Sequence, residues 1–321
     1  MLADQPEKRI TSSDVVHQLE RIRLQFRIDQ TKLLFDLFKA QNYPSTEEVK
    51  ILIAKGVDLN CVDENGLTPL LHLTRIVQNE GENLYQLLHL LIKKEADVNC
   101  KDKYGFNALH FLCLNYQNEN LIEIIRLLIE NGIEVNCKQK EGWSVLHFLC
   151  RKYKNDNLID IIRLLIEKGI DVNCKDKDGR NVLHYLCGKC KKDNLIEIIK
   201  LLIENGIKVN CKDNCELNAL VHLCSFLQNK NLIDIIRLLI ENGIDVNCKD
   251  MKGWNALYLL CQNYKNENLI DIIRLLIENG IELESKTFDY FASYYKKENR
   301  DEILDLLGQH LKKMANTRPS E

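Results

Sequence analysis

The residues of this chain with the greatest chemical potential are cysteines and histidines, and one short segment brings them together. Cys187-Gly188-Lys189-Cys190, with His184 three residues before it, would place three metal-ligating side chains at helical spacing. A zinc site needs its ligands to converge on one ion, about 2.3 Å from each sulfur. Cys187 also belongs to a set of cysteines that recurs through the chain at a fixed period, which favours a structural role. We therefore predict no metal site and no cofactor.

The histidines show no catalytic constellation. His110, His147 and His184 recur at one position of a repeated segment, which favours a shared structural role. A histidine that activates a nucleophile needs that nucleophile and an orienting acid beside it, and neither accompanies these residues in the sequence. The chain also lacks a P-loop, a dinucleotide-binding glycine motif and a His-Glu-x-x-His motif. We predict no catalytic residues and no enzymatic activity.

Composition and charge narrow the class of protein. The 321 residues are 45% hydrophobic and 28% charged, with a net charge of -3, which is typical of a folded soluble chain and disfavours binding to a nucleic-acid backbone. The 13 cysteines could form a secreted disulfide scaffold. However, the chain is long, the cysteine count is odd and the first residues lack an apolar signal segment. No apolar run has the length of a membrane span, so we expect reduced thiols in the cytoplasm or the nucleus.

A 37-residue period organises the chain. Three sets of residues recur at this step: Cys100, Cys137, Cys174, Cys211 and Cys248; Cys113, Cys150, Cys187, Cys224 and Cys261; and Asn120, Asn157, Asn194, Asn231 and Asn268. Such self-similarity is the signature of an architecture built from stacked repeats. Each unit then supplies one small set of helices that packs only against its neighbours.

Each unit is predicted to contain a turn followed by two helices. In the unit 100–136, residues 101–106 have turn chemistry, residues 107–113 begin a first helix, and residues 121–129 are apolar at helical spacing. Asn120 and Glu123 form a capping-box pattern, which predicts a side-chain cap on the second helix here and in the later units. We call the turn that precedes each first helix a finger.

This unit resembles the ankyrin repeat. Gly66-Leu67-Thr68-Pro69-Leu70 is similar to the Thr-Pro-Leu-His start of an ankyrin first helix, and Glu95-Ala96-Asp97-Val98-Asn99 resembles the usual ending. The unit is about four residues longer than the usual 33. We expect the extra residues between the two helices, either as a longer first helix or as a longer loop. The resemblance implies an all-α ankyrin-repeat solenoid of stacked helix-turn-helix units with short β-turn fingers.

The predicted organisation places a repeat array between two capping segments. Residues 61–284 form six repeats, with boundaries 61–99, 100–136, 137–173, 174–210, 211–247 and 248–284. Residues 14–60 are expected to form an N-terminal capping helix and a divergent repeat, and residues 285–313 a C-terminal capping helix pair. Residues 1–13 and 314–321 are expected to be disordered.

The resemblance implies structural roles for the recurring residues. The cysteines occupy positions where ankyrin repeats usually have alanine, so we expect small buried side chains without disulfides. The histidines occupy the position whose imidazole bonds locally and ties neighbouring fingers together. In the sixth finger, Glu216 replaces the turn glycine, so we expect the segment 212–217 to be distorted or strained.

The candidate binding residues lie in the fingers. The position after the turn glycine varies strongly within an otherwise uniform repeat: Leu67, Phe106, Trp143, Arg180, Leu217 and Trp254. Aromatic and arginine side chains are typical of binding hot spots, although packing onto a neighbouring finger would also explain them. A second set forms a lysine ladder at the finger base: Lys101, Lys138, Lys175, Lys212 and Lys249. Either this ladder recognises an acidic segment or it is a solvated stripe that neighbouring aspartates neutralise.

The resemblance implies a non-catalytic protein–protein interaction module, a scaffold or an adaptor. Its concave face of fingers and first helices would bind another protein that carries an acidic or apolar segment, and neither a membrane nor a nucleic acid is expected. The alternative is a sensor for a small ligand or an oligonucleotide, with stacking on the groove aromatics and contacts from the lysines. Oligonucleotide binding would weaken more steeply with salt than aromatic-anchored protein binding.

Overall fold

In the computed structural model of the chain, the described residues are 12–39, 44–76, 81–189, 194–225, 231–263, 268–283, 285–295 and 300–317. Regular secondary structure within these ranges is entirely helical, without a strand. The chain divides into two compact units, Met1–Glu134 and Val135–Glu321. No helix in the described part combines the length and the apolar composition that crossing a membrane would need.

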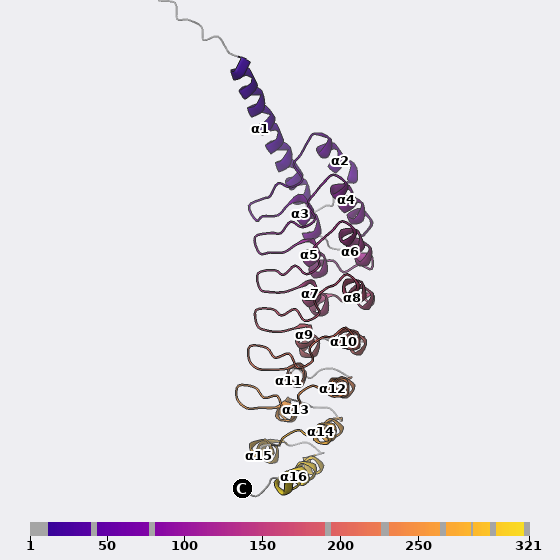
Figure 1. Ribbon diagram of the computed structural model, residues 1–321, viewed down its shortest axis with the longest axis vertical. Helices are drawn as coiled ribbons and strands as arrows, with labels where there is room; N and C mark the ends of the chain where they lie inside the picture. Colours follow the sequence, from indigo (N-terminus) through magenta and orange to yellow (C-terminus); the bar gives the residue numbers. More distant parts are fainter. Residues whose placement is uncertain are drawn as a thin grey trace, which may run out of the picture. The chain divides into compact units, whose positions relative to one another are not determined.

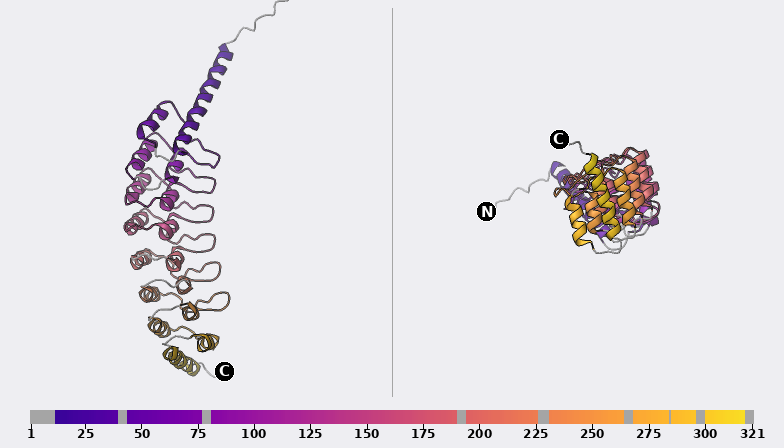
Figure 2. Two further views of the ribbon diagram at one scale, coloured as in Figure 1. Left: turned by 180° about the vertical axis from the view of Figure 1, so that it is seen from behind. Right: turned by 90° about the horizontal axis from the view of Figure 1, so that it is seen from below.

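Unit 1 consists of two layers of helices (Figure 1). The first layer contains α1 (Ser12–Lys39), α3 (Pro69–Arg75) and α5 (Ala108–Asn115), and the second contains α2 (Thr46–Ala54), α4 (Gly81–Lys93) and α6 (Leu121–Glu130). Neighbours within each layer contact each other in these orders. The fingers project beside the first layer, and each leads into a first-layer helix (Figure 2).

Unit 2 repeats the same two-layer arrangement. Its first layer contains α7 (Val145–Lys152), α9 (Val182–Lys189), α11 (Ala219–Ser225), α13 (Ala256–Asn263) and α15 (Ser285–Tyr294). Its second layer contains α8 (Leu158–Glu167), α10 (Leu195–Glu204), α12 (Leu232–Glu241), α14 (Leu269–Glu278) and α16 (Arg300–Thr317). Each helix contacts the next one in its own layer. The prediction of stacked helix-turn-helix repeats with short fingers is therefore confirmed within unit 1 and within unit 2.

The second-layer helices bury the apolar stripe that their sequence predicts. In α6, Leu121, Ile124, Ile125 and Leu128 are fully buried, because positions three and four residues apart share one helix face. Burying each such side chain contributes roughly 1.5–3 kcal/mol. The recurring cysteines of the first helices are also buried, as expected: Cys113, Cys150, Cys187, Cys224 and Cys261.

In the repeats 100–136 and 137–173, whose inter-helix segments are fully described, the extra residues form a longer loop between the helices. In the repeat 100–136, α5 ends at Asn115 and α6 begins at Leu121. Tyr116 and Tyr153 occupy the same position of two such loops, and both side chains are fully buried. The hydroxyl of Tyr153 donates a hydrogen bond of 2.8 Å to Oδ1 of Asn157. The insertion therefore brings its own buried anchor into the stack.

The predicted capping box on the second helices is wrong. Asn120 has φ -71° and ψ 0° and makes no side-chain cap, and the equivalent asparagines make none either. A side-chain cap needs an extended backbone at the cap residue, whereas Asn120 already lies in a helical turn. The backbone amide of Asn120 instead donates a hydrogen bond of 2.9 Å to Oδ1 of Asn118. Capping boxes occur at the first helices, where Asn107 pairs with His110 and Ser144 with His147.

The two ends differ from the predicted boundaries. Helix α1 begins at Ser12, inside the segment expected to be disordered, and α16 continues to Thr317. Residues 1–11 and 318–321 lie outside the described residues. The capping box of α2, in which Ser45 and Glu48 satisfy each other's backbone amides, is present in the divergent N-terminal repeat.

Each finger is closed by one acidic or amide side chain. In the sixth finger, Oδ1 of Asp213 accepts hydrogen bonds from the amides of Cys215 (2.9 Å) and Leu217 (3.0 Å). The amide of Asp213 in turn donates to the carbonyl of Leu217 at 2.9 Å. Glu216 has φ 62°, where the other fingers have glycine. The expected distortion of this finger is therefore absent, and the strain is confined to the backbone of Glu216.

Candidate interaction surface

The fingers and first helices of unit 2 form an aromatic cluster around Trp143. This half-buried side chain follows the turn of its finger, and its ring centroid lies 5.1 Å from Phe148 and 5.0 Å from Tyr185. Phe148 belongs to α7 and Tyr185 to α9. Trp143 thus joins its finger to its own first helix and to the first helix of the next repeat.

An arginine lies over this cluster. The guanidinium carbon of Arg151 is 4.9 Å from the ring centroid of Trp143 and 5.9 Å from that of Tyr185. Such contacts stabilise a cation by about 0.5–1 kcal/mol at exposed sites. Arg151 is exposed, and no carboxylate in the described part of the chain forms an ion pair with it. The rings therefore hold a positive charge whose hydrogen-bond donors stay available.

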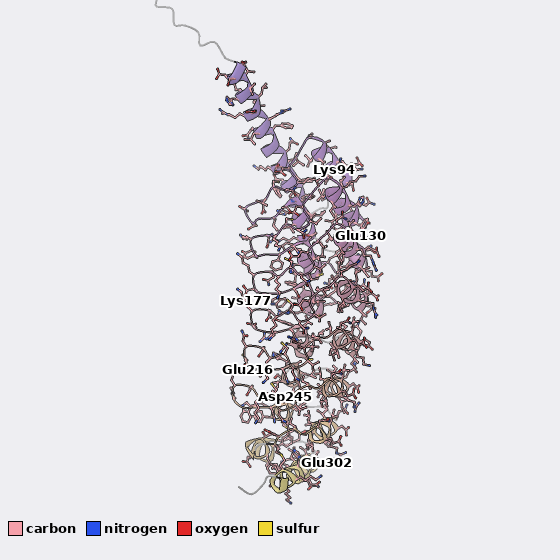
Figure 3. The ribbon with its side chains drawn as sticks, viewed as in Figure 1. Lys94, Glu130, Lys177, Glu216, Asp245 and Glu302 are labelled. Carbon is pink, nitrogen blue, oxygen red and sulfur yellow. The ribbon has the colours of Figure 1, made fainter. Side chains whose placement is uncertain are left out.

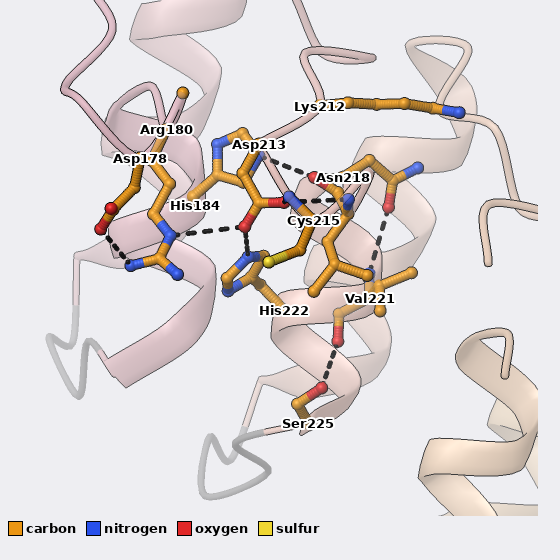
Figure 4. A network of polar contacts seen from close by, with 12 residues as sticks. Asp178, Arg180, His184, Lys212, Asp213, Cys215, Asn218, Val221, His222 and Ser225 are labelled. Carbon is orange, nitrogen blue, oxygen red and sulfur yellow. Dashed lines mark hydrogen bonds and ion pairs between the residues drawn. The ribbon is translucent and has the colours of Figure 1, made fainter. Parts of the chain in front are cut away.

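The predicted contact residue Arg180 is used differently. Its guanidinium donates to Asp178 across 3.2 Å and to Oδ2 of Asp213 across 3.4 Å (Figure 4). Asp213 belongs to the following finger, so Arg180 links two fingers of unit 2. Its charge is largely compensated by these carboxylates, although its side chain is only half-buried.

A buried histidine completes the network at Asp213. Nε2 of His222 donates to Oδ2 of Asp213 across 2.9 Å, and the ring of His222 meets that of His184 edge-on at 5.2 Å (Figure 4). Burial lowers the pKa of His222, and the hydrogen bond to Asp213 offsets only part of that effect. Burial acts to raise the pKa of Asp213, but hydrogen bonds from His222 and the finger amides together lower it.

The same contact recurs in two other repeats. His72 donates to Asp63 across 2.9 Å, and the hydroxyl of Tyr185 donates to Asp176. In each pair a polar side chain on the first helix lies nine residues after the finger aspartate. The fixed spacing between a finger aspartate and a following His or Tyr is the signal that would have found them.

The recurring histidines act as predicted. Nδ1 of His184 accepts from the amide of Asn181 (3.2 Å), and its Nε2 donates to the carbonyl of Leu217 in the next finger (3.1 Å). His147 makes the equivalent bonds to Ser144 and Arg180. Burial, followed by the charge of His222, lowers the pKa of His184 to about 4. These imidazoles therefore serve as neutral ties between fingers.

Leu67, at the same position of the first finger, is fully buried. The other predicted finger residues, Phe106, Leu217 and Trp254, are half-buried and also pack locally. Trp254 stacks on Tyr258 with ring centroids 3.5 Å apart, and Leu217 is half-buried in its finger. In unit 1, Phe106 stacks on Phe111 at 5.2 Å. Each of these side chains therefore keeps part of its surface accessible while the fold fixes its position.

The lysines of the ladder are mostly exposed, and several of them form ion pairs with glutamates. Lys101 pairs with Glu134 at 3.1 Å, and Lys249 pairs with Glu282 at 3.2 Å. The other members are Lys138, which is exposed; Lys175, which donates to a backbone carbonyl; and Lys212, which lies 3.9 Å from Glu216. The finger aspartates next to these lysines direct a carboxylate oxygen into the turn. The tips of the fingers carry further charge, as Lys177 and Glu216 show (Figure 3).

A second ladder, at the base of the repeats, ties neighbours together. In unit 1, Nδ2 of Asn99 donates to the carbonyl of Gly132 (2.9 Å), and its Oδ1 accepts from the amide of Glu134 (2.7 Å). The same two bonds recur in unit 2 at Asn136, Asn173, Asn210 and Asn247. In the sequence, these asparagines stand out only as part of the repeat ending. Their paired donor and acceptor keep successive repeats in register.

The described cysteines form neither disulfides nor a cluster with metal-binding geometry. The twelve described cysteines are free, and among the described residues no group of three His, Cys, Asp or Glu side chains could hold a metal ion. Cys190 lies outside the described residues, so the segment Cys187–Cys190 is tested only in part. Burial raises the pKa of Cys113 and Cys224 far above the ordinary value for a thiol.

Comparisons with known proteins agree with this architecture. A family model for ankyrin repeats (3 copies) matches residues 37–139, 73–176, 112–213 and 186–287. Among solved structures, the crystal structure of the ankyrin repeat domain of Bcl-3, a member of the IkappaB protein family, is similar with a TM-score of 0.52 and 22% sequence identity. The match covers 71% of this chain and 91% of that one. No curated protein matches the sequence. Ankyrin repeats are generally protein–protein interaction modules and are typically non-catalytic. Because the family matches run from residue 37 to residue 287, the chain belongs to the ankyrin-repeat family.

Proposed function

We propose that this chain is a non-catalytic scaffold or adaptor that binds a partner protein through the fingers and first helices of unit 2. Arg151, Trp143 and Tyr185 form the centre of that surface, and Arg180, Leu217 and Trp254 lie along it. Phe106 offers a comparable contact point on unit 1. The lysine ladder borders each unit's finger face.

The observation that carries this proposal is the position of Arg151. A guanidinium that two rings already hold in place loses little additional side-chain conformational entropy when it binds a partner. Because no described carboxylate pairs with it, a partner carboxylate would gain a charge-assisted hydrogen bond without breaking an internal one. We therefore infer a partner segment that brings an acidic side chain to Arg151 and apolar side chains to Trp143 and Trp254.

The test compares variants of the full chain in affinity purification from the native cell, read by quantitative mass spectrometry. Arg151→Glu and Trp143→Ala should each lose the proteins that the wild type retains, since central anchors contribute more than about 1 kcal/mol. Arg163→Glu is the matched control, because Arg163 is an exposed arginine on the outer helix α8. Retention of the same proteins by Arg151→Glu and Trp143→Ala would overturn the proposed surface.

Two controls make the result specific. Thermal melts must show that Arg151→Glu keeps the fold, as an exposed side chain should allow. A fluorescent oligonucleotide titrated at two salt concentrations tests the nucleic-acid alternative. Tight binding that weakens steeply with salt would favour that alternative over a protein partner.

A further inference from the structure

The N-terminal half of α1 projects away from the other helices of unit 1. The C-terminal half packs into the first layer through Leu34, Phe35 and Phe38, which are buried, and the ring of Phe35 contacts that of His72 at 5.2 Å. Residues 12–26 are all exposed, and Figures 1 and 2 show this part of the helix extending beyond α2. About four turns of helix therefore lie outside the packed layers of unit 1.

This projecting segment carries a continuous apolar stripe. Val15, Leu19, Ile22 and Phe26 are 44%, 58%, 64% and 50% exposed. Their spacing of four, three and four residues places them on one face of the helix, which is the pattern of a coiled-coil seam. Val16 borders this face, and the exposed Leu33 continues it. A helix that was meant to stand alone in water would carry polar residues at these positions.

We propose that this stripe, Val15-Leu19-Ile22-Phe26, is a dimerisation surface that pairs antiparallel with the same stripe of a second copy of the chain. A twofold interface requires a surface that complements itself. The spacing of four, three and four residues reads the same in both directions, so an antiparallel pair places every stripe residue opposite another. Val15 then faces Phe26 of the second copy, and Leu19 faces Ile22 of the second copy.

Side-chain size favours this orientation. The antiparallel pair sets the largest stripe residue, Phe26, against the smallest, Val15, and two residues of similar volume against each other. A parallel pair would set phenylalanine against phenylalanine and valine against valine, which leaves one layer crowded and another underfilled. Cores fill best when large and small side chains alternate across facing positions.

The attachment of α1 to the rest of unit 1 suits the same orientation. The rest of unit 1 is attached at the C-terminal end of α1. An antiparallel pair therefore keeps the two attached sets of helices at opposite ends.

The size of the stripe suits a reversible dimer. Half-exposed side chains of this kind leave an apolar patch on the order of 500 Å² per chain, which lies at the upper end for the surface of a monomer. Two such patches would bury on the order of 1,000 Å² in total, which is near the lower bound for a specific interface. The dimer should accordingly be concentration-dependent.

Sedimentation velocity of the full chain over about 1–100 µM tests the pairing. The wild type should change from monomer to dimer over this range, and Ile22→Glu should stay monomeric, with dimerisation weakened roughly 100-fold because its carboxylates would be buried against Leu19. Leu24→Glu is the matched control, because Leu24 is 59% exposed on the same helix but lies off the stripe. A wild type that remains monomeric throughout, or equal weakening by both substitutions, would overturn the proposal. Circular dichroism must show unchanged helicity for each variant.

A charge-pair experiment tests the orientation. Val15→Glu alone and Phe26→Lys alone should each weaken the dimer, because each places an unpaired charge in the stripe. The combined Val15→Glu, Phe26→Lys variant should recover dimerisation, because an antiparallel pair brings the two opposite charges together twice. A parallel pair would instead bring like charges together, so failure of the combined variant to recover overturns the antiparallel arrangement. Capture of a monomeric wild type by anionic lipid vesicles would replace the second copy with a membrane.

Discussion

Asp213 and His222 are joined by a hydrogen bond of 2.9 Å that connects a finger to its own first helix. The same carboxylate closes the finger turn with its other oxygen and also receives Arg180 from the preceding finger. One side chain therefore fixes the turn, the helix that follows it and the neighbouring repeat.

Replacing Asp213 by asparagine should destabilise the protein by about 1–3 kcal/mol. The side-chain oxygen of asparagine can still accept from the backbone amides of the finger. Its NH₂ group, however, faces two other donors, Nε2 of His222 and the guanidinium of Arg180. Asp250→Asn is the matched control, because Asp250 closes its finger through the amides of Lys252 and Trp254 and is followed by Leu259 at the position of His222. Urea unfolding should give the larger loss for Asp213→Asn. Equal losses would show that the contact with His222 and Arg180 contributes nothing.

The protein should lose stability as the pH falls from about 6.5 towards 4. The pKa of His184 is lowered to about 4 in the folded protein by burial and then by the charge of His222, whereas an unfolded histidine has a pKa near 6.5. Between these values the unfolded chain binds more protons, so the free energy of unfolding decreases with decreasing pH. Burial lowers the pKa of His147 and His222 in the same direction.

Melting temperatures at pH 7.5, 6.5 and 5.5 would measure this effect before most carboxylates titrate. The His184→Gln variant should be less stable at every pH and should show a shallower pH dependence, because it lacks one of the titrating groups. A melting temperature that stays constant from pH 7.5 to 5.5 would show that the buried histidines are not neutral ties.

The repeat could be predicted from the sequence because its signals are periodic. The 37-residue step located each helix pair, and the apolar spacing within residues 121–129 identified the buried face. The caps could not be predicted in this way. Asn120 and Glu123 match a capping box in their residue types. However, the loop before the helix, which the buried Tyr116 anchors, gives Asn120 a helical backbone instead of the extended conformation that a cap requires.

The candidate surface was predicted only in part, because it depends on contacts between repeats. Trp143 was identified by its variability within the repeat, but its contact with Tyr185 comes from a first helix 42 positions later in the chain. Arg151 is held by the rings of Trp143 and Tyr185 together, and no local sequence pattern predicts a contact that involves two repeats. Likewise, an N-terminal capping helix was predicted within residues 14–60, but only the fold shows that the apolar stripe of α1 is left uncovered.

Thiol reactivity should separate the finger cysteine from the buried ones. Cys215 is exposed at a finger tip, whereas Cys113, Cys150 and Cys224 are fully buried and burial disfavours the reactive thiolate. Under native conditions an alkylating reagent should modify Cys215 first, and the other three should react only after denaturant is added. Peptide mass spectrometry at increasing reaction times measures the order, and Cys215→Ser removes the fast phase. Rapid native labelling of Cys113 would contradict its buried position.

Two glutamates should be replaceable by glycine with a gain in stability. Glu216 and Glu95 have φ 62° and 66°, in the left-handed region that costs a non-glycine residue about 1–2 kcal/mol. Glu95 occupies the position after the second helix where other repeats have glycine, as its carbonyl shows by accepting from Asn60 across 3.2 Å. Glycine also gives the unfolded chain more freedom, so the net gain should be about 0.5–1 kcal/mol for each change.

The hydrogen bonds of the finger decide what else Glu216→Gly should do. Its turn repeats the geometry of the preceding finger, with the amide of Asp213 bonded to the carbonyl of Leu217 at 2.9 Å and that of Asp176 bonded to the carbonyl of Arg180 at 3.0 Å. The only ion pair of Glu216 in the described residues is an exposed one with Lys212 at 3.9 Å, which should contribute little. The substitution should therefore raise the melting temperature and leave partner binding unchanged.

Glu64→Gly is the control for this prediction, because Glu64 is an exposed finger residue that lies outside the positive-φ set. Glycine there gives the unfolded chain freedom without relieving strain, so the protein should become less stable by a few tenths to about 1 kcal/mol. A melting temperature that falls for Glu216→Gly as it does for Glu64→Gly would mean that Glu216 is not strained. Weaker partner binding by a more stable Glu216→Gly protein would mean instead that the glutamate shapes this finger for its partner.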